Sequence, residues 1–185
     1  MERKLDRVSS NQYLGIIINE NLTWSDHVEH LCTKVLQRLG LLRRIKCFPR
    51  NMRELFVKTT IIPSLDYADV TWGDKNNVIL MNKIQVLQNT AARIVLDKPM
   101  HSSATEALVQ LGWENMKRRR SFCRMILIFK ALNGLIDWDF NFCSFKDIHG
   151  YNTRSKDNIC KPPSHRSWGQ KRFIYNAVNE WNTTR

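Results

Sequence analysis

The sequence predicts a mainly helical fold, and three observations lead to this prediction. Apolar residues recur at intervals of three and four through most of the first 132 positions, which is typical of amphipathic helices. A β-branched run stands near the N-terminus, and the helical periodicity fades after residue 134. The 185-residue chain is 43% hydrophobic, enough for a core. We therefore expect a bundle of about five helices, a short N-terminal strand and a small mixed α/β tail.

The N-terminal part predicts a strand followed by the first helix. Residues 13–19, "YLGIIIN", form a β-branched run closed by asparagines, which indicates a strand and a turn. Asp26 is a candidate helix cap. The expected apolar face of the helix comprises Leu31, Cys32, Val35, Leu36, Leu39 and Leu42. The expected polar face comprises His27, His30, Lys34, Gln37 and Arg38, and Gly40 should weaken the last turn.

Prolines bound the next two predicted helices. Pro49 should begin the second helix, because proline is tolerated in a first helical turn, and Pro63 should kink or restart it. The third helix is predicted over residues 80–95, where apolar residues form a narrow stripe, and Pro99 should end it.

Two further helices are predicted before the periodicity fades. "SATE" at 103–106 has capping-box spacing and should open a short helix that ends near Gly112. Residues 114–132 should form a helix with a basic first half and a second half, 125–132, that is apolar nearly all round and should be buried. Asn133-Gly134 is a natural stop.

These elements suggest three parts of the chain. Residues 1–24 would form a strand segment, residues 25–134 the helical domain, and residues 135–185 a small mixed appendage with a turn or linker at Pro162-Pro163.

Charge is the most informative functional feature. The chain carries 29 Lys and Arg against 17 Asp and Glu, a net charge of +12, which favours a polyanionic partner such as nucleic acid. The excess is concentrated in residues 34–58, 113–130 and 154–172, each with six or more cations against one acid. Each run could instead be a solvated helix face. Trp24, Trp72 and Trp113 are expected core anchors, although tryptophans also offer stacking surfaces to bases.

The cations at helical spacing are candidate phosphate contacts. In the first helix and the turn after it they are Lys34, Arg38, Arg43, Arg44 and Lys46. In the helix over 114–132 they are Lys117, Arg118, Arg119, Arg120 and Arg124. Because Lys117, Arg120 and Arg124 follow spacings of three and four, we expect them to share one face.

No metal, disulfide or membrane feature is predicted. His27 and His30 lie close on a helix, but Cys32 points roughly 160–200° away from them, so one ion cannot take all three. The five cysteines are scattered without C-x-x-C spacing, which indicates reduced intracellular thiols. No glycine-rich phosphate loop occurs. The start of the chain lacks the apolar stretch of a secretory signal, and "MILIF" at 125–129 is too short to span a bilayer.

Six motifs in a fixed order resemble one family. They are "YLGIIINENLTWSDHVEHL", "IIPSLDYADVTWG", "LQNTAARIV", "LGWENMKRRR", "HGYNTRSK" and "IYNAVNEWN". Together they cover about residues 11–182 and resemble the region that follows the catalytic palm in reverse transcriptases of non-LTR (LINE-type) retrotransposons.

The resemblance implies a fragment of a transposable element's RNA-directed DNA polymerase. The fold would be thumb-like, with fingers, palm and endonuclease upstream, and the parent enzyme would use Mg²⁺. "DYADV" looks like the start of a Tyr-x-Asp-Asp metal turn, but Val70 replaces the second carboxylate that two-metal chemistry needs. We therefore expect no catalytic residues, no cofactor and no activity in this chain alone.

The partner implied by the resemblance is an RNA or RNA–DNA template–primer duplex, with the upstream palm and fingers as further contacts. The duplex would be held through phosphates, by shape and without sequence readout, in the cytoplasm or the nucleus. Tyr151 and Arg154 would reach it from the tail. The alternative is a relic or host-adopted helical module that binds a protein.

Overall fold

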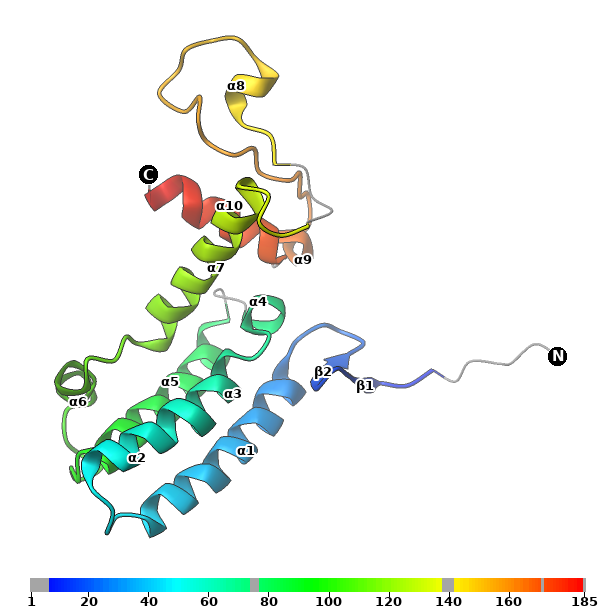
Figure 1. Cartoon of the computed structure of the whole chain (residues 1–185). Helices are drawn as coiled ribbons and strands as arrows, with labels where there is room; N and C mark the ends of the chain where they lie inside the picture. Colours follow the sequence, from blue (N-terminus) through cyan, green and yellow to red (C-terminus); the bar gives the residue numbers. More distant parts are fainter. Residues whose placement is uncertain (1–6, 74–76, 138–141, 171, 185) are drawn as a thin grey trace. The chain divides into compact units, whose positions relative to one another are not determined.

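The computed structural model describes residues 7–73, 77–137, 142–170 and 172–184. It is mainly helical with one small N-terminal sheet, which confirms the predicted fold class (Figure 1). The described residues form two compact units: one combines the chain up to Trp72 with Val78–Met116, and the other contains the chain from Lys117 onward. The predicted three-part division stays a prediction, and its residues 1–6 and 138–141 lie outside the described ranges.

The N-terminal strand is a hairpin, so the prediction of one continuous strand over 13–19 is wrong. β1 (Ser10–Tyr13) pairs antiparallel with β2 (Ile16–Asn19), with Tyr13 opposite Ile16. Leu14 and Gly15 connect them with φ of 47° and 81°. Positive φ at both central residues is what a type I′ hairpin turn requires, and glycine adopts it without steric cost.

Helix α1 (Ser25–Arg44) buries the stripe that the periodicity predicts. Its buried apolar residues are Val28, Leu31, Val35, Leu39 and Leu42. Three details differ from expectation. Trp24, with φ of 62°, is the N-cap in place of Asp26, Leu36 is exposed, and His27 of the expected polar face is buried. The helix continues through Gly40 to Arg44.

The region around Pro63 is a helix with a widened turn. α2 (Arg50–Phe56) leads into a π-helical turn, η1 (Val57–Ile61), and then α3 (Ile62–Asp66). Pro63 has no N–H to donate, so the helix loses one backbone hydrogen bond at this point. A π-helical turn accommodates that loss without ending the helix. The Thr59 and Thr60 hydroxyls donate to the carbonyls of Leu55 (2.9 Å) and Phe56 (2.6 Å). Pro49 is the N-cap residue, one position before the first turn.

The last two helices of the first unit end near the residues predicted to end them, Pro99 and Gly112. α4 (Asp69–Trp72) is set off from α3 by Ala68, whose φ is 50°. α5 (Val78–Val95) packs against α1 and α6 (Ala104–Leu111). The Ser103 hydroxyl accepts from the Glu106 N–H at 3.3 Å, and Gly112 ends α6 in the left-handed region. Trp72 lies in the core, while Trp24 and Trp113 pack half-buried against it.

The second unit has a small core of its own. α7 (Met116–Leu132) enters it, and α8 (Phe145–Ile148), α9 (Ser167–Gln170) and α10 (Phe173–Thr184) follow. The core is formed by Ile128, Ile159, Ala177 and Val178. The expectation that residues 125–132 are buried is wrong for most of them: Ile128 is 1% exposed, but Phe129 is 52% exposed. Two arginines from the basic half are buried instead.

Candidate nucleic-acid interface

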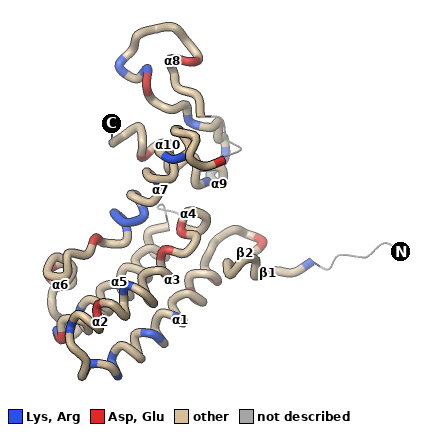
Figure 2. The backbone as a smooth tube through the Cα atoms, in the orientation of Figure 1, with Lys and Arg blue, Asp and Glu red and all other residues tan. Residues whose placement is uncertain are grey.

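Exposed cations lie on α1, both in the middle of the helix and in its last turn. Lys34, Arg43 and Arg44 are exposed, and none of them makes a hydrogen bond or ion pair with another described residue. Arg43 and Arg44 occupy the last turn of the helix, where cations also interact favourably with the helix dipole. Figure 2 shows basic positions along this end of α1 and into the turn that precedes α2. These side chains can meet an external phosphate without breaking an internal contact.

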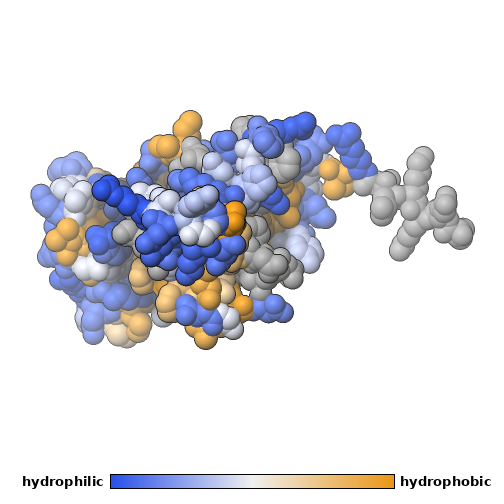
Figure 3. Space-filling view, turned by 90° about the horizontal axis from the view of Figure 1, so that it is seen from above, coloured by the Kyte–Doolittle hydropathy of each residue, from blue (hydrophilic) through white to orange (hydrophobic). Residues whose placement is uncertain are grey.

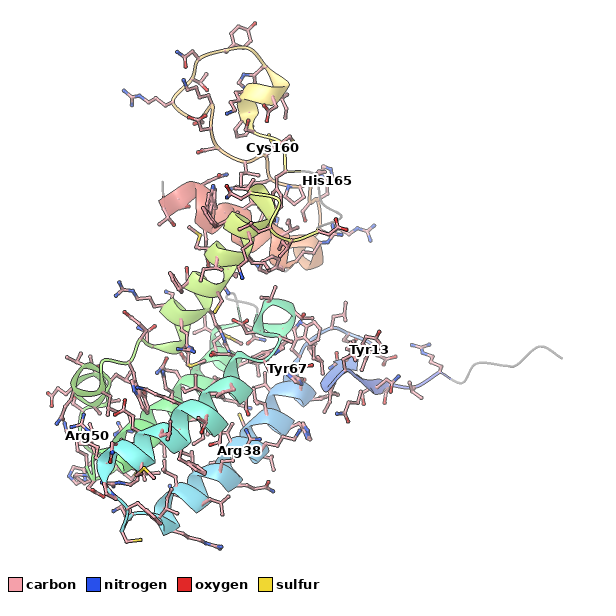
Figure 4. The ribbon with its side chains drawn as sticks, viewed as in Figure 1. Tyr13, Arg38, Arg50, Tyr67, Cys160 and His165 are labelled. Atoms are coloured by element: carbon pink, nitrogen blue, oxygen red, sulfur yellow. The ribbon has the colours of Figure 1, made fainter. Side chains whose placement is uncertain are left out.

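Arg38, by contrast, uses its guanidinium for hydrogen bonds inside the fold. Its guanidinium donates to the Thr60 carbonyl at 2.6 Å and to the Ser64 hydroxyl, so it connects α1 to η1 and α3 (Figure 4). The carbonyl of Thr60 also accepts from the Ser64 hydroxyl at 3.0 Å. Arg38 is therefore engaged within the fold.

Lys46 belongs to a network around Asp97. Arg53 is buried, donating to the Ile94 carbonyl at 3.0 Å and to Asp97 at 2.6 Å, while Lys46 lies 3.6 Å from the same carboxylate. The hydrogen bond from Arg53, assisted by the charges of both cations, holds the pKa of Asp97 below its usual range. Arg50 donates to the Gln110 carbonyl at 3.2 Å (Figure 4). Lys46 keeps an exposed ammonium group, whereas Arg53 is structural.

The basic half of α7 divides by burial. Lys117 and Arg118 are exposed and Arg119 is half-buried, but Arg120 and Arg124 are only 3% and 4% exposed. Both Nε and Nη2 of Arg124 donate to the Glu180 carboxylate at 2.9 Å, and Ser121 adds a bond of 3.1 Å. The expected phosphate-facing stripe of Lys117, Arg120 and Arg124 is therefore reduced to Lys117.

Tyr151 and Arg154 lie on the loop between α8 and α9, and both are exposed. Tyr151 is 76% exposed, and its ring centroid lies 5.8 Å from that of His149. His149 in turn stacks at 6.0 Å on Phe145. Phe145 and His149 were not among the predicted site residues, because only the folded loop shows that their rings adjoin Tyr151.

The side chain of His27 makes its contacts inside the fold. It is 4% exposed, its Nδ1 accepts the Ile17 N–H at 3.3 Å, and its ring meets Trp72 edge-on with 5.2 Å between centroids. Among the described residues, no group of three or more His, Cys, Asp and Glu side chains is placed to hold a metal ion. His27 thus fixes the hairpin onto α1.

Acidification should destabilise the chain through His27. Burial, together with the charges of His30 and Lys34, lowers the pKa of His27. The unfolded chain then binds this proton more readily, so the stabilising contribution is complete above about pH 6.5 and is lost as the pH falls below that value. Urea unfolding at about pH 5 and about pH 7.5 measures the difference. A His27→Gln variant, which cannot titrate, should lose this part of the pH dependence; an unchanged pH dependence would contradict the assignment.

Asp69 of "DYADV" is buried, 4% exposed, within α4.

Within the part of the chain that the structure describes, no helix combines the length and apolar character needed to cross a membrane.

The comparison with curated proteins finds a similarity to a transposon polymerase. The chain is 32% identical over 108 residues to a protein of Drosophila melanogaster described as a probable RNA-directed DNA polymerase from transposon BS. The match covers 55% of this chain and 12% of that protein. No protein-family model and no solved structure matches the chain. The chain thus contains a region related to a transposon reverse transcriptase and spans about an eighth of that relative's length.

Proposed function

We propose that the chain is the thumb and post-thumb part of a non-LTR retrotransposon reverse transcriptase, and that it holds the template–primer duplex through backbone phosphates. The similarity to a transposon polymerase supports the polymerase context. In this proposal the catalytic palm and the Mg²⁺ site belong to upstream parts of the parent protein.

One observation carries the binding proposal: the exposed cations of α1 are not used inside the fold. Arg38 and Arg53 serve internal carbonyls and carboxylates, whereas Lys34, Arg43 and Arg44 make no such contact among the described residues. Phosphate contacts of this kind position a duplex but carry no base information. The proposed contact set is therefore Lys34, Arg43 and Arg44 on α1. Lys46, in the turn after α1, is an exposed cation next to this set.

The second candidate function is a protein-binding module. Phe122, Ile126 and Phe129 follow one another on α7 at spacings of four and three, and they are 66%, 38% and 52% exposed. Such spacing forms one helical face, and an exposed apolar face is typical of a protein contact. Apolar burial responds little to salt, whereas phosphate binding weakens steeply as salt rises.

Replacing Arg43 and Arg44 with alanine should flatten the salt dependence of duplex binding. Each phosphate contact contributes roughly 0.7–0.9 to the slope of log affinity against log salt, so the double variant should lose about 1.5 units. Affinity should fall alike for duplexes of different sequence. Fluorescence anisotropy with a labelled RNA–DNA hybrid over a salt series measures both quantities.

The matched control removes two charges that are already paired. Lys58 lies 2.7 Å from Glu54 and Lys83 lies 3.7 Å from Glu29, so the Lys58→Ala, Lys83→Ala variant has the same net charge as the test variant. It should leave the slope nearly unchanged. Equal slopes in the two variants would mean that charge acts diffusely and that the end of α1 makes no defined phosphate contacts.

A further inference from the structure

The loop of residues 144–159 is closed at its base. Ser144 and Ile159 form an antiparallel bridge, and the backbone N–H groups of Phe145 and Lys146 donate to the carbonyls of Asn158 (3.0 Å) and Lys156 (2.9 Å). Asp147 caps α8 by accepting from the N–H and hydroxyl of Ser144. The side chains on this loop therefore project from a backbone fixed at both ends.

Three rings follow one another along this loop. Phe145 and His149 stack with 25° between their planes, and Tyr151 continues the series at 43°. Exposure rises along the series, from half-buried Phe145 and His149 to Tyr151 at 76%. A buried hydrophobic role does not explain a tyrosine this exposed, whereas a ring supported on one side and open on the other suits stacking by a planar ligand.

The charge on the loop favours an anionic ligand. Residues 144–161 contain four Lys or Arg against two Asp, a net charge of +2. Asp147 serves the cap of α8, and Asp157 lies 3.6 Å from Lys146. Arg154 and Lys161 are exposed without an ion pair to other described residues. Figure 3 views the molecule from the side of this loop, and hydrophilic residues predominate on the face nearest the viewer.

We propose that this loop binds unpaired nucleotides of single-stranded RNA or DNA, with Tyr151 stacking on a base and Arg154 contacting the adjoining phosphate. Rings next to cations are the combination that sequence-independent single-strand binders use, because every base has a π face. The inference rests on the proposed nucleic-acid function and adds a second ligand class, the unpaired strand, to the duplex. It assigns Phe145 and His149 the role of supporting the tyrosine ring.

The experiment compares base-bearing with abasic strands on the full chain. Tyr151→Ala should weaken binding of an RNA oligonucleotide by about 5- to 150-fold, since stacking contributes about 1–3 kcal/mol per base. It should leave an abasic strand of the same length unaffected, because that strand keeps its phosphates. Tyr151→Phe should retain most of the affinity. A DNA strand run in parallel shows whether the sugar matters.

The matched control is Tyr13→Ala, since Tyr13 is also an exposed tyrosine, at 66%, on β1 (Figure 4). It should bind both strands as the unmodified chain does. Equal losses on base-bearing and abasic strands, or a Phe variant as weak as the Ala variant, would overturn the stacking assignment. Duplex binding with the Arg43/Arg44 slope effect but no single-strand binding would also overturn it while leaving the proposed function standing. Base-dependent single-strand binding without that slope effect would overturn only the duplex proposal.

Discussion

Glu180→Ala should lower the free energy of unfolding by about 3–5 kcal/mol, which is the usual cost of removing one partner of a buried ion pair. The side chains of Arg124 and Glu180 are 5% and 17% exposed, and both bonds between them measure 2.9 Å. Without the carboxylate, the Arg124 guanidinium would stay buried without its counter-charge. Chemical denaturation followed by circular dichroism measures the loss.

Two controls separate burial from charge. Arg7 and Glu20 also pair at 2.9 Å, but their side chains are 89% and 44% exposed, so Glu20→Ala should cost about 0–1 kcal/mol. Replacing both Arg124 and Glu180 with apolar residues, Met and Leu, should restore most of the stability lost in Glu180→Ala, because no unpaired charge remains. A cost below about 1 kcal/mol for Glu180→Ala would show that water reaches the pair and that Arg124 remains available to a ligand.

The helices were predictable because their signal is local. Periodicity at 3.6 residues identified the buried stripe of α1. The Ser103 cap and the end of α6 at Gly112 depend on only a few neighbouring residues. The hairpin was missed because its turn depends on pairing with Ser10–Tyr13, a polar segment without an apolar alternation. A local pattern of residues does not show which other segment a strand pairs with.

The candidate site was predictable only in part for the same reason. Cations at the end of α1 remain exposed because the chain turns there, but Arg124 meets an acid 56 positions further on, at Glu180. Helical spacing tells which cations share a face but not which of them meet a partner. The aromatic series at 145, 149 and 151 needed the closed loop before its rings could be seen to adjoin.

Trp72→Ala should be the most destabilising change in the first unit, at about 3–5 kcal/mol, the usual cost of truncating a buried aromatic residue. Trp72 is 1% exposed and lies in the larger core. Its Nε1 donates to the Tyr67 carbonyl at 2.8 Å, across the break between α3 and α4. Trp72→Phe should cost about 1–3 kcal/mol, since it keeps most of the volume but leaves that carbonyl without its donor. Phe122→Ala, at a ring 66% exposed, is the control and should change stability by less than about 0.5 kcal/mol.

The effect of Trp72 should also extend to the hairpin. The Trp72 ring meets His27 edge-on, His27 accepts the Ile17 N–H, and Tyr67 donates from its hydroxyl to the Leu14 carbonyl at 2.8 Å. Removing the indole takes away the ring against which His27 packs, so the Ile17 amide should exchange with solvent faster in Trp72→Ala, beyond the change explained by lower global stability. Hydrogen exchange measured at Ile17 and, as the reference, at the α5 amide of Ala91 compares the two. Equal acceleration at both amides would contradict a local coupling and leave Trp72 with a packing role alone.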